Sequence, residues 1–400
     1  MALQRTMEDH IEQMLLETPF YSRLKEACNL NEWEEWKGYH APVVFTDLAQ
    51  EYFAMRNSCG VFDLSPMIKY KIEGPDALAF LDKLMTRNMK KQRVGQVLYV
   101  IWCNDDGQVL DDGTVFRFET DLYRLCSAGR HMDWLQCTAL GFDVEITDET
   151  AEIAALAVQG PTTCHILRNL GWNGLEDLKP FNISYFDFEG TTICVSRTGF
   201  TGDLGYELWM PPNCAEAFWD RLMEAGKDRR IMPIGSRALD MVRIEAGFLQ
   251  AGVDFVYAET TVRSGRTRSP YELGFGWLVH LDKAHFNGRN ALAREKADGS
   301  QYQFVKLDVA GNRPAEHAFI YNKHKKAVGT VTSAVWSPIS KTNIAFASLE
   351  IPWGEPGTEL YAEIYFLREL KWTREMVPCN IVRDAAHNPA HRRAVPAPSL

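Results

Sequence analysis

The sequence predicts an α+β protein of two or three domains that ends in a small all-β domain, and three observations support this. The chain has 400 residues, which is too many for one small core. Residues 68–129 mix the alternation typical of strands with the longer period of a helix. From about residue 303 onward the chain becomes a series of short strands, which favours a separate barrel.

The mixed part of the chain contains one order of elements twice. A strand, a Gly-Pro break and a helix occur at residues 68–85, with the break at Gly74, and again at residues 152–170, with the break at Gly160. This is either a weak internal duplication or an accident of sequence. After the first copy, the sequence predicts a β-meander with strands at residues 97–103, 114–118 and 122–127.

The second half of the chain predicts two helices and then the barrel. The helices are expected at residues 215–226 and 235–246, which carry apolar stripes. The polar stretch at residues 294–300 is the expected boundary before the all-β domain. The strands expected in that domain are residues 304–309, 327–336, 344–349 and 359–366.

Composition and charge favour a reduced, cytoplasmic protein. The net charge of -10 argues against a general nucleic-acid binder and against docking on anionic membranes. The N-terminus carries acidic residues where a signal peptide needs a basic start, and no apolar run is long enough to span a membrane. The nine cysteines form no C-x-x-C pair, and Pro389 prevents a helical pair between His387 and His391, so no metal site is expected.

One short segment concentrates acidic residues. Residues 104–113, NDDGQVLDDG, place four aspartates between two expected strands. Such doublets serve as turn residues, as cation ligands or as groups that hold a substrate, and Asp105 and Asp106 have ordinary turn chemistry. The chain has no Walker loop, no G-x-G-x-x-G, no H-E-x-x-H and no G-x-S-x-G, so the generic motifs do not choose among these functions.

Six segments of the chain resemble six motifs of a known protein family and occur in the same order. They are residues 60–67, 107–115, 196–208, 235–247, 274–292 and 329–338. In this order they resemble the tetrahydrofolate-dependent aminomethyltransferase family, which includes the glycine-cleavage T protein and folate-dependent demethylases. The resemblance covers roughly residues 18 to 385.

The resemblance implies a three-domain disc, in which two α/β folate-binding domains surround a central pocket and a β-barrel follows. The expected parts are residues 1–50 with 150–240 for one α/β domain, 51–149 for the other, 241–298 for a folate and substrate segment, and 299–400 for the barrel and tail.

Tetrahydrofolate is the cofactor that the resemblance implies, and two carboxylates would act on it. Glu207 would bind the pterin, because a carboxylate can accept two parallel hydrogen bonds from its edge. Asp112 would face the reactive end, where it can orient the ring, hold a proton or stabilise positive charge. The role of Asp111 stays open. The remaining residues expected to line the pocket, each of which could instead be a turn or core residue, are Gln159, Tyr99, Phe200 and Met67.

The loop that follows Asp254 departs from the T protein, because it is roughly nine residues longer. It carries Arg263, Arg266 and Arg268, which are expected either to bind a carboxylate or phenolate of a small substrate or to be solvated. Tyr257 at its start is the candidate acid for a substrate whose leaving oxygen must be protonated.

The resemblance therefore implies an enzyme, a tetrahydrofolate-dependent methyltransferase or demethylase. It would move a methyl or methylene group from N, O or S of a small substrate. The basic loop and the aromatic residues near the N-terminus would suit a carboxylate-bearing or aromatic compound, although both are also ordinary surface and core features. The first alternative is the glycine-cleavage aminomethyltransferase, which uses a lipoyl carrier protein. The second is a folate-binding protein without catalysis, against which Asp112 and Glu207 count.

Overall fold

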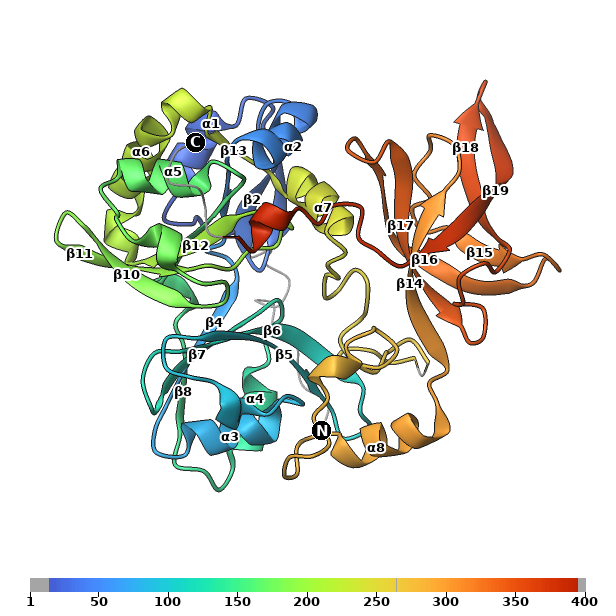
Figure 1. Ribbon diagram of the computed structural model, residues 1–400, viewed down its shortest axis with the longest axis horizontal. Helices are drawn as coiled ribbons and strands as arrows, with labels where there is room; N and C mark the ends of the chain where they lie inside the picture. The colour runs from blue at the N-terminus through green and yellow to red at the C-terminus, as the bar shows by residue number, and fades with distance from the viewer. Residues whose placement is uncertain (1–13, 264, 395–400) are drawn as a thin grey trace.

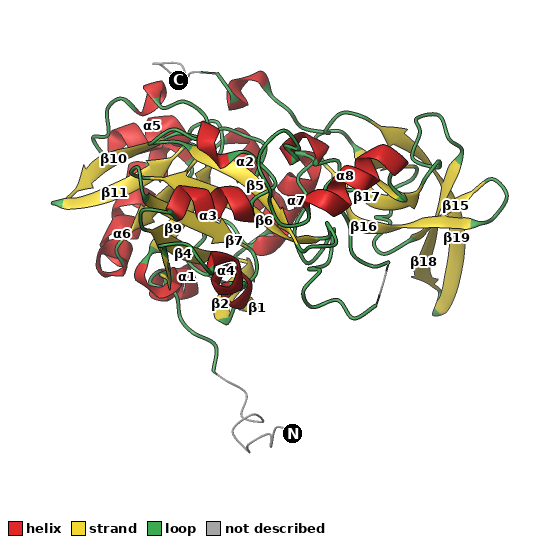
Figure 2. Ribbon diagram, turned by 90° about the horizontal axis from the view of Figure 1, so that it is seen from below, coloured by secondary structure: helices red, strands yellow, loops and turns green. Residues whose placement is uncertain are grey.

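The computed structural model describes residues 14–263 and 265–394, and these form three units around a common centre. Figure 1 shows the arrangement face-on, with the barrel apart from two sheet-based units, and Figure 2 shows the same disc from its edge. The expected α+β class, the three-unit disc and the C-terminal barrel are confirmed. We call the parts the five-stranded unit, the six-stranded unit and the barrel.

The five-stranded unit is an antiparallel sheet with the order β5-β6-β7-β4-β8. Two helices, α3 and α4, cover one face of it, and Phe80, Trp102 and Leu135 are fully buried in the core between them. Its elements are β4 (Ile68–Glu73), α3 (Ala77–Leu84), η2 (Met89–Lys91), β5 (Val97–Cys103), β6 (Val109–Arg117), β7 (Leu122–Ser127), α4 (Met132–Ala139), β8 (Glu145–Asp148) and η3 (Thr150–Glu152).

The six-stranded unit has the order β10-β11-β12-β9-β3-β13, in which only β3 and β13 pair in parallel. One apolar cluster joins the sheet to α1, α5 and α6, and a second joins it to α2 and α7. Its elements are α1 (Tyr21–Ala27), β1 (Glu32–Trp36), β2 (Tyr39–Val44), α2 (Leu48–Asn57), β3 (Gly60–Asp63), β9 (Ala154–Gln159), α5 (Thr163–Asn169), η4 (Leu175–Asp177), β10 (Ile183–Phe188), β11 (Thr191–Ser196), β12 (Gly205–Met210), η5 (Pro212–Cys214), α6 (Ala215–Ala225), η6 (Lys227–Arg229), β13 (Met232–Pro233) and α7 (Ser236–Glu245), with β1 and β2 forming a separate hairpin.

The barrel is closed, with the order β14-β17-β16-β15-β18-β19 and a final pairing of β19 with β14. The polar stretch at residues 294–300, expected as a linker, is mostly helix, because α8 continues to Asp298. The elements from the central loop onward are η7 (Gly276–Leu278), α8 (Arg289–Asp298), β14 (Tyr302–Val309), β15 (Phe319–Asn322), β16 (Ala327–Ser337), β17 (Thr342–Glu350), β18 (Leu360–Arg368), β19 (Lys371–Val382) and η8 (Ala390–Arg392).

The repeated order of strand, Gly-Pro break and helix has a structural counterpart. In each sheet a three-stranded meander lies beside the repeated strand, β4 in one and β9 in the other. Gly74 and Gly160 have φ of +133° and +135°. A Cβ atom would lie 2.6 Å from the carbonyl oxygen of Asp143 at Gly74 and 2.4 Å from that of Ser58 at Gly160. Both breaks therefore require glycine for the same reason, namely its φ and the close approach of a neighbouring chain.

Three expectations from the sequence need correction. The strand expected at residues 114–118 begins at Val109, so Asp111 and Asp112 lie within β6. The sequence pattern did not predict this part of the strand, because aspartates are rare in strands. Here their side chains are stabilised by partners that are distant in sequence. Strands β15 and β19 were not anticipated. The sheets also divide the chain differently from the expected ranges, since β3 pairs with β9 and residues 60–63 thus belong to the six-stranded sheet.

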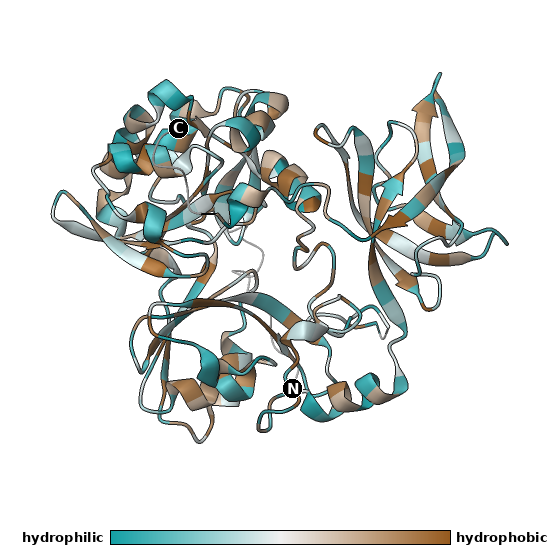
Figure 3. Cartoon of the chain, in the orientation of Figure 1, coloured by the Kyte–Doolittle hydropathy of each residue, from teal (hydrophilic) through white to brown (hydrophobic). Residues whose placement is uncertain are grey.

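The distribution of hydropathy follows this architecture. In Figure 3 the strands of the five-stranded sheet carry much of the apolar colour, whereas α6 on the periphery alternates hydrophilic and hydrophobic segments. Within the described ranges, no helix has the length and apolar character needed to cross a lipid bilayer.

Candidate functional site

Asp112 forms the centre of the first half of the site. The hydroxyl of Tyr99 on β5 donates a hydrogen bond of 2.6 Å to Asp112 Oδ2. Both side chains project from the same face of the sheet, because Tyr99 pairs with Thr114, two residues beyond Asp112. Burial, followed by the charge of Asp111, raises the pKa of Asp112 to about 7, against the opposing effect of the Tyr99 bond. This carboxyl can therefore gain or lose a proton near neutral pH.

Aromatic rings surround this carboxyl. The ring of Tyr99 lies 5.7 Å from that of Phe275 and stacks at 6.4 Å on Trp277, whose side chain is largely exposed. Tyr257, from the loop after Asp254, belongs to the same apolar cluster as Tyr99. Burial, and then the charges of Asp111 and Asp112, raise the pKa of the Tyr257 hydroxyl, so it keeps its proton at neutral pH.

Glu207 on β12 provides the second carboxyl. Its Oε2 accepts a hydrogen bond of 2.5 Å from the hydroxyl of Thr198, which in turn lies 2.6 Å from the Ser196 hydroxyl. Burial raises the pKa of Glu207 to about 7, although these two hydroxyls act in the opposite direction. Trp209, on the same face of β12 as Glu207, packs on Phe116, on the same face of β6 as Asp112, with ring centroids 5.2 Å apart. The two carboxyls therefore project from sheet faces that pack on each other.

The two carboxyls share an unusual feature. Among the residues that the structure describes, neither Asp112 nor Glu207 forms an ion pair with a lysine, arginine or histidine. Each is half-buried and bonded only to hydroxyl or backbone groups. Carboxyl groups held in this way are expected to take donors from a ligand, because burial without a partner is costly.

Three of the other sequence-predicted residues lie near these groups. Phe200 stacks on Phe248 with centroids 5.6 Å apart, and Met67 packs where the two sheets meet. Gln159 is buried, and its amide donates to the carbonyls of Thr198 and Tyr206 at 3.2 and 3.3 Å. Its side chain therefore holds both the residue before Glu207 and the threonine whose hydroxyl bonds to Glu207, and its contact with a pterin stays a prediction.

Comparison with known proteins agrees with this geometry. Residues 23–283 match the GCVT N-terminal domain, and residues 303–374 match the glycine cleavage T-protein C-terminal barrel domain. The chain belongs to this aminomethyltransferase family. The resemblance found in the sequence motifs is thus confirmed, and the relatives point to a transferase.

Individual relatives differ in how much of the chain they cover. An aminomethyltransferase of Halothermothrix orenii is 33% identical over 330 residues, which cover 82% of this chain and 90% of that protein. A trimethylamine-oxide aldolase of Ruegeria pomeroyi is 36% identical over 404 residues, covering 97% of this chain, which spans about half (49%) of the aldolase. The crystal structure of glycine cleavage system aminomethyltransferase T from Bartonella henselae has a TM-score of 0.80, covers 96% of this chain and 100% of its own, and at 23% identity supports the fold.

The three arginines of the inserted loop are placed differently from one another. Arg268 donates to Ser348 Oγ of the barrel at 2.9 Å, and its guanidinium lies 3.8 Å from the ring centroid of Tyr302. Arg263 and Arg266 are exposed on the same loop. Their role in substrate binding stays a prediction, while Arg268 fixes the loop to the barrel.

Two other cations, which the sequence gave no signal to single out, lie near the aromatic rings. The guanidinium of Arg87 donates to the Tyr99 carbonyl at 2.8 Å and lies 5.9 Å from the Trp277 ring centroid. The ammonium group of Lys37 lies 5.6 Å from the Tyr257 ring centroid. Within the described parts of the chain, neither cation pairs with an acidic side chain. Burial lowers the pKa of Arg87.

The C-terminal tail returns to the six-stranded unit, as Figure 1 shows in red. His387 Nε2 lies 3.1 Å from Asp203 Oδ2, and His391 Nε2 lies 2.6 Å from Asp203 Oδ1. The guanidinium of Arg392 lies 4.9 Å from the Phe248 ring centroid. The two histidines thus fasten the tail beside the Phe200–Phe248 stack, and no cluster able to hold a metal is found among the residues described.

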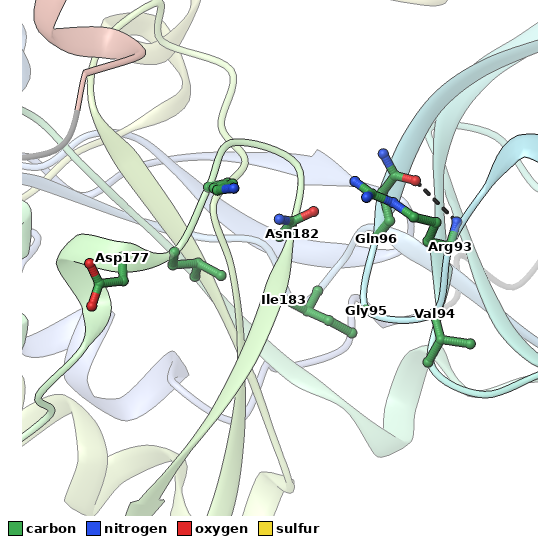
Figure 4. Close-up of a pocket in the computed structure, with 9 residues that line it drawn as sticks. Arg93, Val94, Gly95, Gln96, Asp177, Asn182 and Ile183 are labelled. Carbon is green, nitrogen blue, oxygen red and sulfur yellow. Dashed lines mark hydrogen bonds between the residues drawn. The ribbon is translucent and has the colours of Figure 1, made fainter.

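A cleft of about 480 Å³ lies elsewhere, at the junction of the two sheet-based units. Figure 4 shows the turn Arg93–Gln96 on one side and Asp177, Asn182 and Ile183 on the other. The cleft contains neither carboxyl of the site, so its size alone does not make it the functional centre.

Proposed function

We propose that the protein is a tetrahydrofolate-dependent methyltransferase or demethylase that moves a methyl or methylene group from N, O or S of a small substrate. The observation that supports this most directly is the pair of half-buried carboxyls, Asp112 and Glu207, with pKa values raised to about 7 and no basic partner among the described residues. Groups that destabilise the empty protein in this way are typical of binding and catalytic sites. The nine free thiols favour a cytoplasmic enzyme.

Each site residue would have a different role in the reaction. Glu207 would hold the pterin edge, and Phe200, Met67 and Tyr99 would supply apolar surface against it. Tetrahydrofolate would supply the nitrogen that accepts the one-carbon group. Asp112 accepts the Tyr99 hydroxyl at Oδ2, which leaves Oδ1 as the atom that takes or gives a proton beside the reacting centre. Holding both reactants among these rings would provide most of the rate by positioning.

The substrate side of the site is formed by Tyr257 and nearby cations. Tyr257 keeps its proton at neutral pH and can donate it to a leaving oxygen. Arg87 and Lys37 lack acidic partners within the described ranges and suit a carboxylate or phenolate. Arg263 and Arg266 would add attraction for anions from the exposed loop.

The pattern of relatives favours a small free substrate. The alignment with the trimethylamine-oxide aldolase covers 97% of this chain, whereas that with the Halothermothrix orenii aminomethyltransferase covers 82%. The name of the aldolase specifies a small N-methylated compound. The second candidate is an aminomethyltransferase that uses a lipoyl carrier protein. It is favoured by the 33% identity to the Halothermothrix orenii aminomethyltransferase, 90% of which is covered by the alignment.

The deciding experiment is a screen of methylated amines, amine oxides, sulfonium compounds and aryl methyl ethers with tetrahydrofolate. Mass spectrometry would separate 5-methyl- from 5,10-methylenetetrahydrofolate. A parallel reaction would contain an aminomethylated lipoyl carrier. Turnover with a free donor supports the proposal, turnover only with the carrier supports the second candidate, and tetrahydrofolate binding without turnover of any donor would contradict both.

A further inference from the structure

Asp111, whose function the sequence left open, lies directly behind the reacting carboxyl. It is fully buried, and its side chain leaves β6 on the face opposite to that of Asp112. Asp111 Oδ1 accepts the backbone N–H of Asp112 at 2.8 Å, and Oδ2 accepts that of Gly129 at 2.7 Å. The Asp111 carboxylate therefore fixes the backbone from which Asp112 projects.

A histidine joins Asp111 to the inserted loop. The Nε2 atom of His131 lies 3.0 Å from Asp111 Oδ2, and its Nδ1 lies 2.9 Å from Glu259 Oε2. His131 is only 4% exposed, and its backbone N–H donates to the Tyr70 hydroxyl at 2.9 Å. An imidazole that faces a carboxylate at each nitrogen can donate at both only as the imidazolium.

Two further contacts show that this arrangement is built into the fold. At Gly129 a Cβ atom would lie 2.6 Å from His131 Nε2, so only glycine lets the histidine reach Asp111. The loop is also bonded to the start of β6, since Ala258 N donates to Val109 O at 3.0 Å and Val109 N donates to Arg268 O at 2.9 Å. Glu259 thus reaches His131 from a segment that is itself attached to the strand of Asp111.

Several other titratable or charged groups face these residues. Tyr70 comes from β4, Tyr99 from β5, and Tyr257 from the loop. The remaining charged groups nearby are Lys37 beside Tyr257, the Arg130–Asp148 pair near Tyr70, and Asp254, which is paired with Arg243. None of these groups contacts the imidazole nitrogens of His131, which among the described residues bond only to Asp111 and Glu259.

We propose that Asp111, His131 and Glu259 form a positioning triad that aligns Asp112 and links its protonation to the contact between the inserted loop and His131. The inference rests on the proposed one-carbon transfer. Asp111 and Asp112 point to opposite faces, so the triad acts on Asp112 through its backbone and through charge, and no proton passes along it. The imidazolium offsets the charge of Asp111, which otherwise disfavours ionisation of Asp112.

The sign of each effect follows from this arrangement. Although burial opposes it, the bonds and charges of Asp111 and Glu259 raise the pKa of His131. Removing the imidazolium in His131→Gln should raise the pKa of Asp112 by roughly half a unit to one unit, because Asp111 is then uncompensated. In Glu259→Gln, the pKa of His131 should fall, since one of its two carboxylate partners is lost.

The test measures these two titrations directly, so it does not depend on knowing the methyl donor. Carbon-13 NMR of the Asp112 carboxyl and nitrogen-15 NMR of the His131 ring would be recorded against pH on the full chain. Asp112→Asn and His131→Gln would assign the signals. Exposed His285 and Glu316 provide matched controls, His285→Gln and Glu316→Gln, which should shift neither titration.

With a donor identified, single-turnover rates complete the test. Glu259→Gln, in which a partly exposed loop residue changes, should slow transfer by roughly tenfold, while tetrahydrofolate affinity stays within about twofold. An Asp112 titration unchanged in His131→Gln would overturn the triad, as would a lowered Tm without any shift in either titration. If no donor is turned over, the transfer proposal fails by itself, and the two NMR titrations still decide the triad.

Discussion

Tyr99 and Asp112 lie on neighbouring strands of one sheet and share a hydrogen bond of 2.6 Å on the face that packs against β12, the strand of Glu207. The bond restrains the carboxyl in one orientation. It also opposes the rise in the pKa of Asp112 that burial and Asp111 produce. A tyrosine in this position therefore sets both the orientation and the acidity of the Asp112 carboxyl.

The first prediction concerns Asp112. Asp112→Asn should keep tetrahydrofolate binding while lowering the single-turnover rate by about a hundredfold or more, the usual scale for a positioned acid–base or electrostatic group. Tyr99→Phe should shift the pH midpoint of the rate upward, because it removes a bond that favours the charged carboxylate. Exposed Asp105→Asn on the same hairpin is the matched control. Full transfer by Asp112→Asn would return this residue to a structural role.

The second prediction concerns tetrahydrofolate affinity. Glu207→Gln should weaken binding by about 2–4 kcal/mol, because the donors of the pterin edge would stay buried without their bidentate acceptor. Isothermal titration with tetrahydrofolate measures this, and exposed Glu189→Gln in the same unit is the control. Affinity within about twofold of the wild type would rule out the assigned contact.

The third prediction concerns stability of the ligand-free protein. Since burial raises the pKa of Glu207 from its ordinary value to about 7, the folded state holds a proton that the unfolded chain has already lost. Stability should therefore fall as pH rises from about 4.5 toward 7. Glu207→Gln removes this penalty, so its Tm should exceed that of the wild type above about pH 7 and match it in acid. A variant that is less stable at every pH would argue against an uncompensated carboxyl.

Periodic patterns revealed much of the fold, and the reason is local. The helix beginning at Ala215 buries one regular face, and the strand from Val97 to Cys103 is an apolar run that is buried on both faces, so their residues alone identify them. The doublet Asp111-Asp112 could not be identified in this way, because aspartates are common in turns and rare in buried strands. What permits them in β6 is a set of partners far away in sequence.

The same physical reason explains which site residues were missed. His131 and Glu259 are 128 positions apart, and neither belongs to a motif. Arg87 follows α3 and resembles any surface arginine until the fold places it beside Tyr99. Asp112 and Glu207 were singled out because the resemblance supplied their roles. No pattern within the chain itself marks a pairing between side chains that only the tertiary structure brings together.

The fourth prediction concerns the C-terminal tail. Although burial opposes it, the hydrogen bonds from His387 and His391 lower the pKa of Asp203. This contribution to stability is present above the ordinary pKa of an aspartate and is lost as pH falls below it. The double variant His387→Ala, His391→Ala should release the tail, which hydrogen exchange over residues 383–394 would detect. The exchange of α8 serves as an internal reference, and unchanged protection of the tail would contradict the role of these histidines.

The last prediction concerns recognition of an anionic substrate. Arg87 is half-buried beside Tyr99 and Trp277 without an acidic partner among the described residues, so its guanidinium can form a charge-assisted bond with a substrate carboxylate or phenolate. Arg87→Ala should raise KM for that substrate by a factor that corresponds to a binding free energy of about 1.5–3 kcal/mol, and it should leave tetrahydrofolate affinity unchanged.

Arg268→Ala should instead lower Tm, because it frees the loop from the barrel. Single substitutions of Arg263 and Arg266 distinguish a specific ion pair from general electrostatic attraction. Loss of one exposed charge should weaken the binding of every anion slightly, and this effect should fade as salt is added. The prediction for Arg87 would be wrong if KM stayed unchanged in Arg87→Ala. If KM then rose at low salt in the Arg263 and Arg266 variants, the site would attract its anion without forming an ion pair with it.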